Sequence, residues 1–213
     1  MLVDLLGNWL PRAASPRFSD LLWRRPDGGR TLYLTFDDGP CPDSTAATLE
    51  LLDRYDVRAA FFLIGQRARA HPALVRDIHA AGHTVGQHSD THPNPWSVSD
   101  AAFTAEMERA TATLEDLTGE AVRWMRPPYG RFTRAMRRWC RAHEQRIVMW
   151  DVMPGDFLPK TTSEDIVTRV ERLVRPGSII VLHEGNHALD VTPAALAHLV
   201  PRLLDEGYRF GVL

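Results

Sequence analysis

Short apolar runs alternate along this chain with longer segments whose apolar residues recur at helical spacing. The runs 32–34, 60–63 and 179–182 are continuously apolar, which is typical of strands buried on both faces of a parallel sheet. The same reading along the whole chain predicts strands near 31–36, 59–63, 83–87, 122–125, 146–150, 178–182 and 208–212.

The segments between these strands are predicted to be helices, near 43–55, 72–81, 98–118, 131–143, 163–174 and 192–206. A proline and two capping residues open the segment 43–55, and glycines follow three of the other segments. Strand–helix alternation of this kind predicts a parallel α/β architecture, either a (β/α) barrel or an open doubly wound sheet.

The size of the chain indicates one domain. It has 213 residues, of which 44% are hydrophobic, and α/β barrels of about 200–250 residues fold as single units. We expect this domain over 31–213, with residues 1–30 as an irregular segment, punctuated by proline and glycine, that packs on it. Two cysteines make no disulfide framework, so Cys41 and Cys140 are expected to be free thiols.

The charge balance narrows the choice of partners. Lysine and arginine total 25 against 27 for aspartate and glutamate, which gives no case for nucleic acid or an anionic membrane. The arginines within 134–141 fall at helical spacing, which favours a solvated helix face over a nucleic-acid patch. No apolar run approaches the about 18 residues of a membrane span. The start of the chain lacks a basic secretory region, so the default expectation is the cytoplasm. The oligomeric state stays open.

Polar residues gather where predicted strands end. Five strands are followed by such clusters, which contain Asp37 and Asp38, His88 and His92, Arg126, Asp151 and Asp156, and His183 and Glu184. In parallel α/β folds the carboxyl ends of the strands lie on one side, where the loops build the active site. The sequence therefore predicts that these distant clusters converge in one mouth.

A metal site is the first chemistry that these clusters indicate. His88 and His92 are four residues apart, and two imidazoles with the carboxylate of Asp38 make an open three-ligand site. Spacing alone is explained more often by two surface histidines, and the adjacent carboxylates Asp37 and Asp38 are equally consistent with a helix cap.

Acid–base catalysis is the second kind of chemistry that these polar clusters indicate. Asp37 is placed to take a proton from a metal-bound water, and Arg126 could hold it ionised. His183 could be the general acid, with Asp156 orienting it. Taken alone, Arg126 is also explained as a solvated arginine at a strand end, and His183 as a hydrogen-bonded histidine at a strand end.

Three motifs together carry a family resemblance. Residues 35–40 read Thr-Phe-Asp-Asp-Gly-Pro, residues 88–93 read His-x-x-x-His-Pro, and residues 126–130 read Arg-Pro-Pro-Tyr-Gly. In order and spacing the chain from about residue 31 onward resembles the polysaccharide deacetylases (carbohydrate esterase family four, nodulation-deacetylase-like). Residues 181–183 resemble the family's last motif. The resemblance implies a distorted (β/α) barrel with about seven strands.

The resemblance also implies roles. Asp38, His88 and His92 would hold a divalent metal, zinc before Co²⁺, Ni²⁺ or Mn²⁺. Asp37 would be the base and Arg126 its tether, while His183 would be the acid, supported by Asp156. The backbone N–H of Tyr129 would help bind the oxyanion.

The chain also departs from the family pattern. Where the family usually has an aspartate, a tryptophan, a leucine and an aspartate, this chain has Met153, Phe157, Val181 and Glu184 respectively. Phe157 and Val181, together with Pro128, would still line an apolar site for the acetyl methyl group, with another shape.

Together these features predict a metal-dependent hydrolase that removes N-acetyl or O-acetyl groups from a carbohydrate, such as an acetylated glucosamine-containing glycan. The alternatives are a non-catalytic glycan-binding domain that retains the metal cleft and a deacylase of another sugar amide. The sequence does not choose among sugars, linkages or metals.

Overall fold

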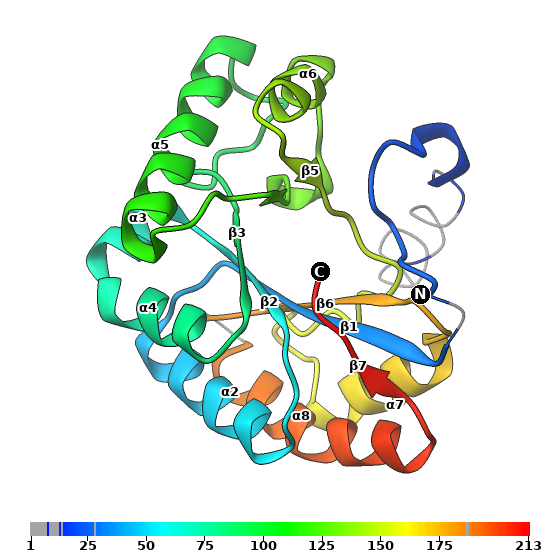
Figure 1. The fold of residues 1–213 in the computed structure, drawn as a ribbon. Helices are drawn as coiled ribbons and strands as arrows, with labels where there is room; N and C mark the ends of the chain where they lie inside the picture. Colours follow the sequence, from blue (N-terminus) through cyan, green and yellow to red (C-terminus); the bar gives the residue numbers. More distant parts are fainter. Residues whose placement is uncertain (1–7, 9–12, 14, 28, 186–187) are drawn as a thin grey trace.

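The computed structural model describes residues 8, 13, 15–27, 29–185 and 188–213. Its centre is a parallel sheet of seven strands with the order β5-β4-β3-β2-β1-β6 and with β7 paired to β1. The strands are β1 (Thr31–Asp37), β2 (Ala60–Leu63), β3 (Thr84–Gln87), β4 (Trp124–Met125), β5 (Arg146–Ile147), β6 (Ile179–His183) and β7 (Arg209–Phe210). The sheet is curled into a distorted (β/α) barrel, which confirms the predicted fold class (Figure 1).

Helices cover the outside of this sheet. They are α2 (Pro42–Arg54), α3 (Gly65–Ala70), α4 (Pro72–Ala80), α5 (Asp100–Thr118), α6 (Arg134–Ala142), α7 (Ser163–Leu173) and α8 (Ala188–Asp205), with 3-10 turns η2 (Ser15–Phe18) and η3 (Pro128–Gly130). Figure 1 shows them in an arc from α7 and α8 through α2 and α4 to α5 and α6. None of the described helices is long and apolar enough to cross a membrane.

Two helix predictions were wrong in detail. The short helix α3 was not predicted, and α8 begins at Ala188 instead of near residue 192. Pro193 lies one residue after the predicted start, and proline is common in the first turn of a helix. Tertiary contacts override this signal: Ala188 and Thr192 are buried, and the Thr192 hydroxyl donates to Asp156 at 2.9 Å.

The side chains of strand β1 point alternately to two separate parts of the hydrophobic core. Leu32, Leu34 and Phe36 pack on the helix-covered side, whereas Tyr33 packs on the inner side with Phe62 and its neighbours. Because side chains alternate along a strand, Thr35 and Asp37 share the inner side with Tyr33. This alternation aims Asp37 at the mouth of the barrel.

The two edges of the sheet are joined by other segments. Leu22 pairs with Val148 beyond β5, and Arg24 pairs with Ser178 before β6. Leu21, Leu22 and Trp23 are buried. The predicted strand 146–150 is shorter than expected: β5 ends at Ile147, and Val148 forms an isolated bridge with Leu22 instead of continuing the ladder.

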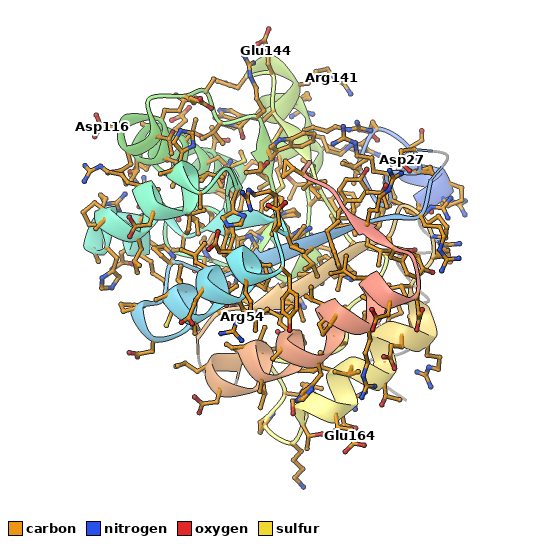
Figure 2. The ribbon with its side chains drawn as sticks, turned by 60° about the horizontal axis from the view of Figure 1, so that its bottom comes forward. Asp27, Arg54, Asp116, Arg141, Glu144 and Glu164 are labelled. Carbon is orange, nitrogen blue, oxygen red and sulfur yellow. The ribbon has the colours of Figure 1, made fainter. Side chains whose placement is uncertain are left out.

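Charged side chains surround this core. In Figure 2 the labelled residues Arg141, Glu144, Asp116 and Glu164 lie at the outer edge of the molecule. On the arginine-rich helix α6, Arg137 forms a two-point ion pair with Asp20 at 2.9 and 2.8 Å. Cys41 and Cys140 are free thiols, as predicted.

Candidate active site

The strand register brings the predicted acid and base together. In the pairing of β1 with β6, Asp37 lies opposite His183. Arg126 follows β4, and its side chain reaches across the barrel to Asp37 at 2.7 Å. His88 follows β3, with its Nε2 3.9 Å from the Asp37 carboxylate. The carboxyl ends of four strands therefore meet at one site.

Asp38, His88 and His92 form one cluster beside Asp37. One ligand atom from each lies within 4.8 Å of the others. The Nε2 atoms of His88 and His92 are 3.6 and 3.3 Å from Asp38 Oδ1. No other group of three His, Cys, Asp or Glu side chains in the described part of the chain meets this criterion.

The donor atoms in this cluster suit a cation. Asp38 Oδ1 is buried and has no hydrogen-bond partner among the described residues, which is costly for a carboxylate oxygen unless a cation binds it. His88 Nδ1 lies 2.6 Å from the carbonyl oxygen of Arg126, so this nitrogen carries the proton and Nε2 is free to bind. Two imidazoles and one carboxylate leave further positions open, as in catalytic zinc sites.

His92 is held neutral near neutral pH. Burial, reinforced by the neighbouring His88, lowers the pKa of His92 to about 4, although Asp38 and Asp37 oppose the shift. A neutral imidazole is the form that binds a metal.

Backbone geometry at the site is unusual. Asp38, Ser89, His92 and Tyr129 have φ angles of 72°, 61°, 59° and 58°. Non-glycine residues rarely adopt this left-handed region, and such strain clusters at functional sites. These turns end the strands abruptly and direct the side chains of Asp38 and His92 toward each other.

Asp37 is a buried, ionised carboxylate. It is 3% exposed, and Arg126, its partner, is fully buried. Burial raises the pKa of Asp37, but Arg126, His88 and His183 together outweigh it and hold that pKa below its ordinary value. Arg126 is fixed by Thr35 at 2.7 Å and by the carbonyl oxygens of Val148 and Met149 at 3.2 and 3.0 Å.

Asp156 holds His183 in position through two contacts. Its Nδ1 lies 2.9 Å from Asp156 Oδ1, and its backbone N–H donates to Asp156 Oδ2 at 2.6 Å. Burial would lower the pKa of His183, but Asp156, with help from Asp37 and Asp38, raises it to about 9. The imidazole is therefore a proton donor near neutral pH, and its Nε2 is the free position.

The residues predicted to contact substrate differ in exposure. Phe157 is 38% exposed, and its ring packs edge-on against His183 with centroids 4.9 Å apart. Val181 is 1% exposed and Pro128 is buried. Tyr129 is 60% exposed and packs against His92 with ring centroids 4.7 Å apart. Their substrate contacts remain predictions.

The scaffold beneath the cluster was not predicted. Asp90, between the two histidines, is buried and bonds Arg69 at 2.7 and 3.1 Å and Arg109 at 3.1 Å. Glu106 of α5 accepts the Thr91 N–H at 2.6 Å. The position of Asp90 within the histidine motif was the only signal, because its arginine partners come from α3 and α5.

Glu184 lies behind the cluster. It is 2% exposed, and both of its carboxylate oxygens are buried. A Cβ added at Gly39 would be 1.8 Å from its Oε2, so the carboxyl group lies directly against that backbone. Burial raises the pKa of Glu184 to about 7, with Thr45 and Arg67 opposing. Arg67 also donates to the Asp38 carbonyl oxygen at 2.7 Å.

The fold and the site together define a class, the (β/α)-barrel hydrolases that carry their chemistry at the carboxyl ends of the strands. The family model for polysaccharide deacetylase matches residues 24–148. The chain belongs to the polysaccharide deacetylase family, and it is an enzyme of the carbohydrate deacetylase type.

Individual relatives agree with this assignment. The chain is 32% identical over 216 residues to a peptidoglycan-N-acetylglucosamine deacetylase of Bacillus cereus, covering 100% of this chain and 77% of the relative. It is 35% identical over 196 residues to a chitooligosaccharide deacetylase of Sinorhizobium fredii, covering 87% and 91%. A solved peptidoglycan N-acetylglucosamine deacetylase in complex with 4-naphthalen-1-yl-N-oxidanyl-benzamide is 30% identical, with a TM-score of 0.88 over 94% of each chain.

Proposed function

We propose that this protein is a metal-dependent deacetylase that removes N-acetyl groups from glucosamine residues of a glycan. The observation that carries the proposal is the placement of the buried Asp37 between the Asp38-His88-His92 cluster and His183. The relatives named for peptidoglycan and chitooligosaccharide deacetylation support N-acetylglucosamine as the substrate sugar and the amide as the reacting bond.

Asp38, His88 and His92 would hold the cation. A divalent ion there would polarise the acetyl carbonyl and activate water, and two imidazoles with one carboxylate favour zinc among the candidate metals. The unpartnered Oδ1 of Asp38 supports this ligand set.

The protein's own groups move the protons. Asp37, held ionised by Arg126, accepts the proton that the attacking water loses. The N–H of Tyr129 donates to the carbonyl oxygen as it becomes negative. His183 then gives its proton to the amide nitrogen while the carbon–nitrogen bond breaks, which releases acetate and the free amine.

Acetate release from N-acetylglucosamine oligomers tests this function. We expect release that stops in EDTA and returns with added zinc. Asp37→Asn should lower kcat by about 10²–10⁴-fold while the zinc content is unchanged. The control is Asp43→Asn, which removes an exposed carboxylate from the first turn of α2. A normal rate in Asp37→Asn would reject its role as the base.

The non-catalytic alternative makes a different prediction. Met153 and Phe157 depart from the family pattern, but Asp156 and His183 form a complete pair with the geometry of a positioned acid. If no acetylated glycan released acetate while glycan binding remained measurable, a binding domain would be the correct function.

A further inference from the structure

Beside the metal cluster, three side chains form a surface that the deacetylation chemistry does not use. We call it the Trp96 platform, and it consists of Trp96, Tyr129 and Arg131. The Tyr129 ring packs against His92 of the cluster at 4.7 Å between centroids. The Arg131 guanidinium carbon lies 5.8 Å from the Tyr129 ring centroid and 4.9 Å from that of Trp96. The platform therefore forms a continuous series of contacts from the metal cluster through Tyr129 and Arg131 to Trp96.

The rings of this platform face solvent but are held in place. Trp96 is 67% exposed and Tyr129 is 60% exposed. The backbone N–H of Trp96 donates to the Asn94 side chain at 3.0 Å, and its indole N–H donates to the Phe132 carbonyl oxygen at 3.4 Å. Large exposed aromatic surface beside a catalytic site marks a ligand-binding surface, and a fixed ring loses little entropy when a flat sugar face stacks on it.

Arg131 gives the platform a charge preference. Its guanidinium lies beside both rings, and it forms no ion pair with any carboxylate of the described residues. Two other arginines of this region, Arg137 and Arg123, pair with Asp20 and Glu144. A guanidinium that lies beside aromatic rings and has no ion pair keeps its N–H groups available for a carboxylate, which it can bind at two points.

We propose that the Trp96 platform binds a carboxylate-bearing sugar next to the acetylated sugar in the same glycan chain. The aromatic faces of Trp96 and Tyr129 take the sugar ring, and Arg131 takes the carboxylate. The proposal rests on the proposed function, because it places the neighbouring sugar beside the site where the acetyl group reacts. It makes the protein selective for acidic glycans over neutral N-acetylglucosamine oligomers.

The test compares three oligosaccharides of equal length. One contains N-acetylglucosamine alone, one alternates it with glucuronic acid, and one alternates it with peptide-free N-acetylmuramic acid. The two acidic substrates separate a ring carboxylate from a lactyl carboxylate. Selectivity is the ratio of kcat/KM for an acidic substrate to kcat/KM for the neutral one. For the wild-type zinc enzyme we expect a ratio above one for at least one acidic substrate, carried by KM and decreasing with added salt.

Variants locate the effect. Arg131→Gln should lower that ratio about tenfold, equivalent to 1.4 kcal/mol. Arg134→Gln removes the same charge from the exposed first residue of α6 and should leave the ratio unchanged. Trp96→Ala should raise KM for all three substrates. Circular dichroism and the melting temperature confirm that each variant is folded.

The outcomes are distinguishable. If the wild-type protein releases acetate from none of the three substrates, the proposed function itself fails. If it releases acetate but prefers neither acidic substrate, or if Arg131→Gln and Arg134→Gln have the same effect on the ratio, the platform is not an anion-selective subsite and the deacetylase assignment stands.

Discussion

The buried carboxyl group of Glu184 should make the protein less stable as the pH rises. The unfolded chain releases this proton near the ordinary pKa of 4.5, whereas burial raises the pKa of the folded state to about 7. Between these values the folded protein binds more protons than the unfolded chain, so the free energy of unfolding falls with increasing pH. Well below pH 4.5 the group is protonated in both states and has no effect.

The magnitude follows from the gap between the two pKa values. At 1.36 kcal/mol for each pKa unit, the gap from 4.5 to about 7 corresponds to about 3 kcal/mol. Glu184→Gln keeps the shape and cannot ionise. The difference in free energy of unfolding, variant minus wild type, should therefore rise by about 3 kcal/mol between pH 4.5 and pH 8. The new amide adds a constant offset, so the change with pH is the quantity to test.

Urea denaturation at several pH values measures this difference, with EDTA present so that metal binding does not contribute. Glu108→Gln, which removes a carboxylate from the exposed side of α5, is the matched control. A difference for Glu184→Gln that stays level or falls with increasing pH would show that the carboxyl group is hydrated or paired, and the reasoning from burial would be wrong.

Three further substitutions test the site. Arg126→Met should lower the free energy of unfolding by about 3–5 kcal/mol, because it leaves the Asp37 charge buried without its partner; a loss below about 1 kcal/mol in urea denaturation, the range of an exposed pair, would contradict this. Asp156→Asn should move the alkaline limb of kcat to lower pH, because Asp156 raises the pKa of His183; an unchanged pH profile would separate His183 from proton donation. Asp90→Asn should weaken zinc binding about tenfold or more, measured by chelator competition, with activity recovering at saturating zinc; unaltered affinity would mean that the arginine clamp does not position the histidines.

Much of the architecture could be predicted because it depends on local patterns. Continuous apolar runs indicated buried parallel strands, and all seven predicted strands have counterparts in the sheet. Boundaries were less accurate where distant contacts decide them. The first turn of α8 exists because Thr192 bonds Asp156 and Ala188 is buried, and neither contact leaves a periodic signal.

The order of residues along the chain shows which side chains follow each strand, and hence that carboxylates, imidazoles and a guanidinium share one end of the barrel. Their pairing depends on the folded arrangement: Asp37 pairs with Arg126, His183 with Asp156, and Asp90 with arginines from two helices. It also decided that Arg131 lies beside Trp96, whereas Arg137 pairs with Asp20. The physical reason is range. Hydrophobic periodicity acts over a few residues, whereas a charge responds to whatever the fold brings within a few ångströms, and most of those neighbours are far away along the chain.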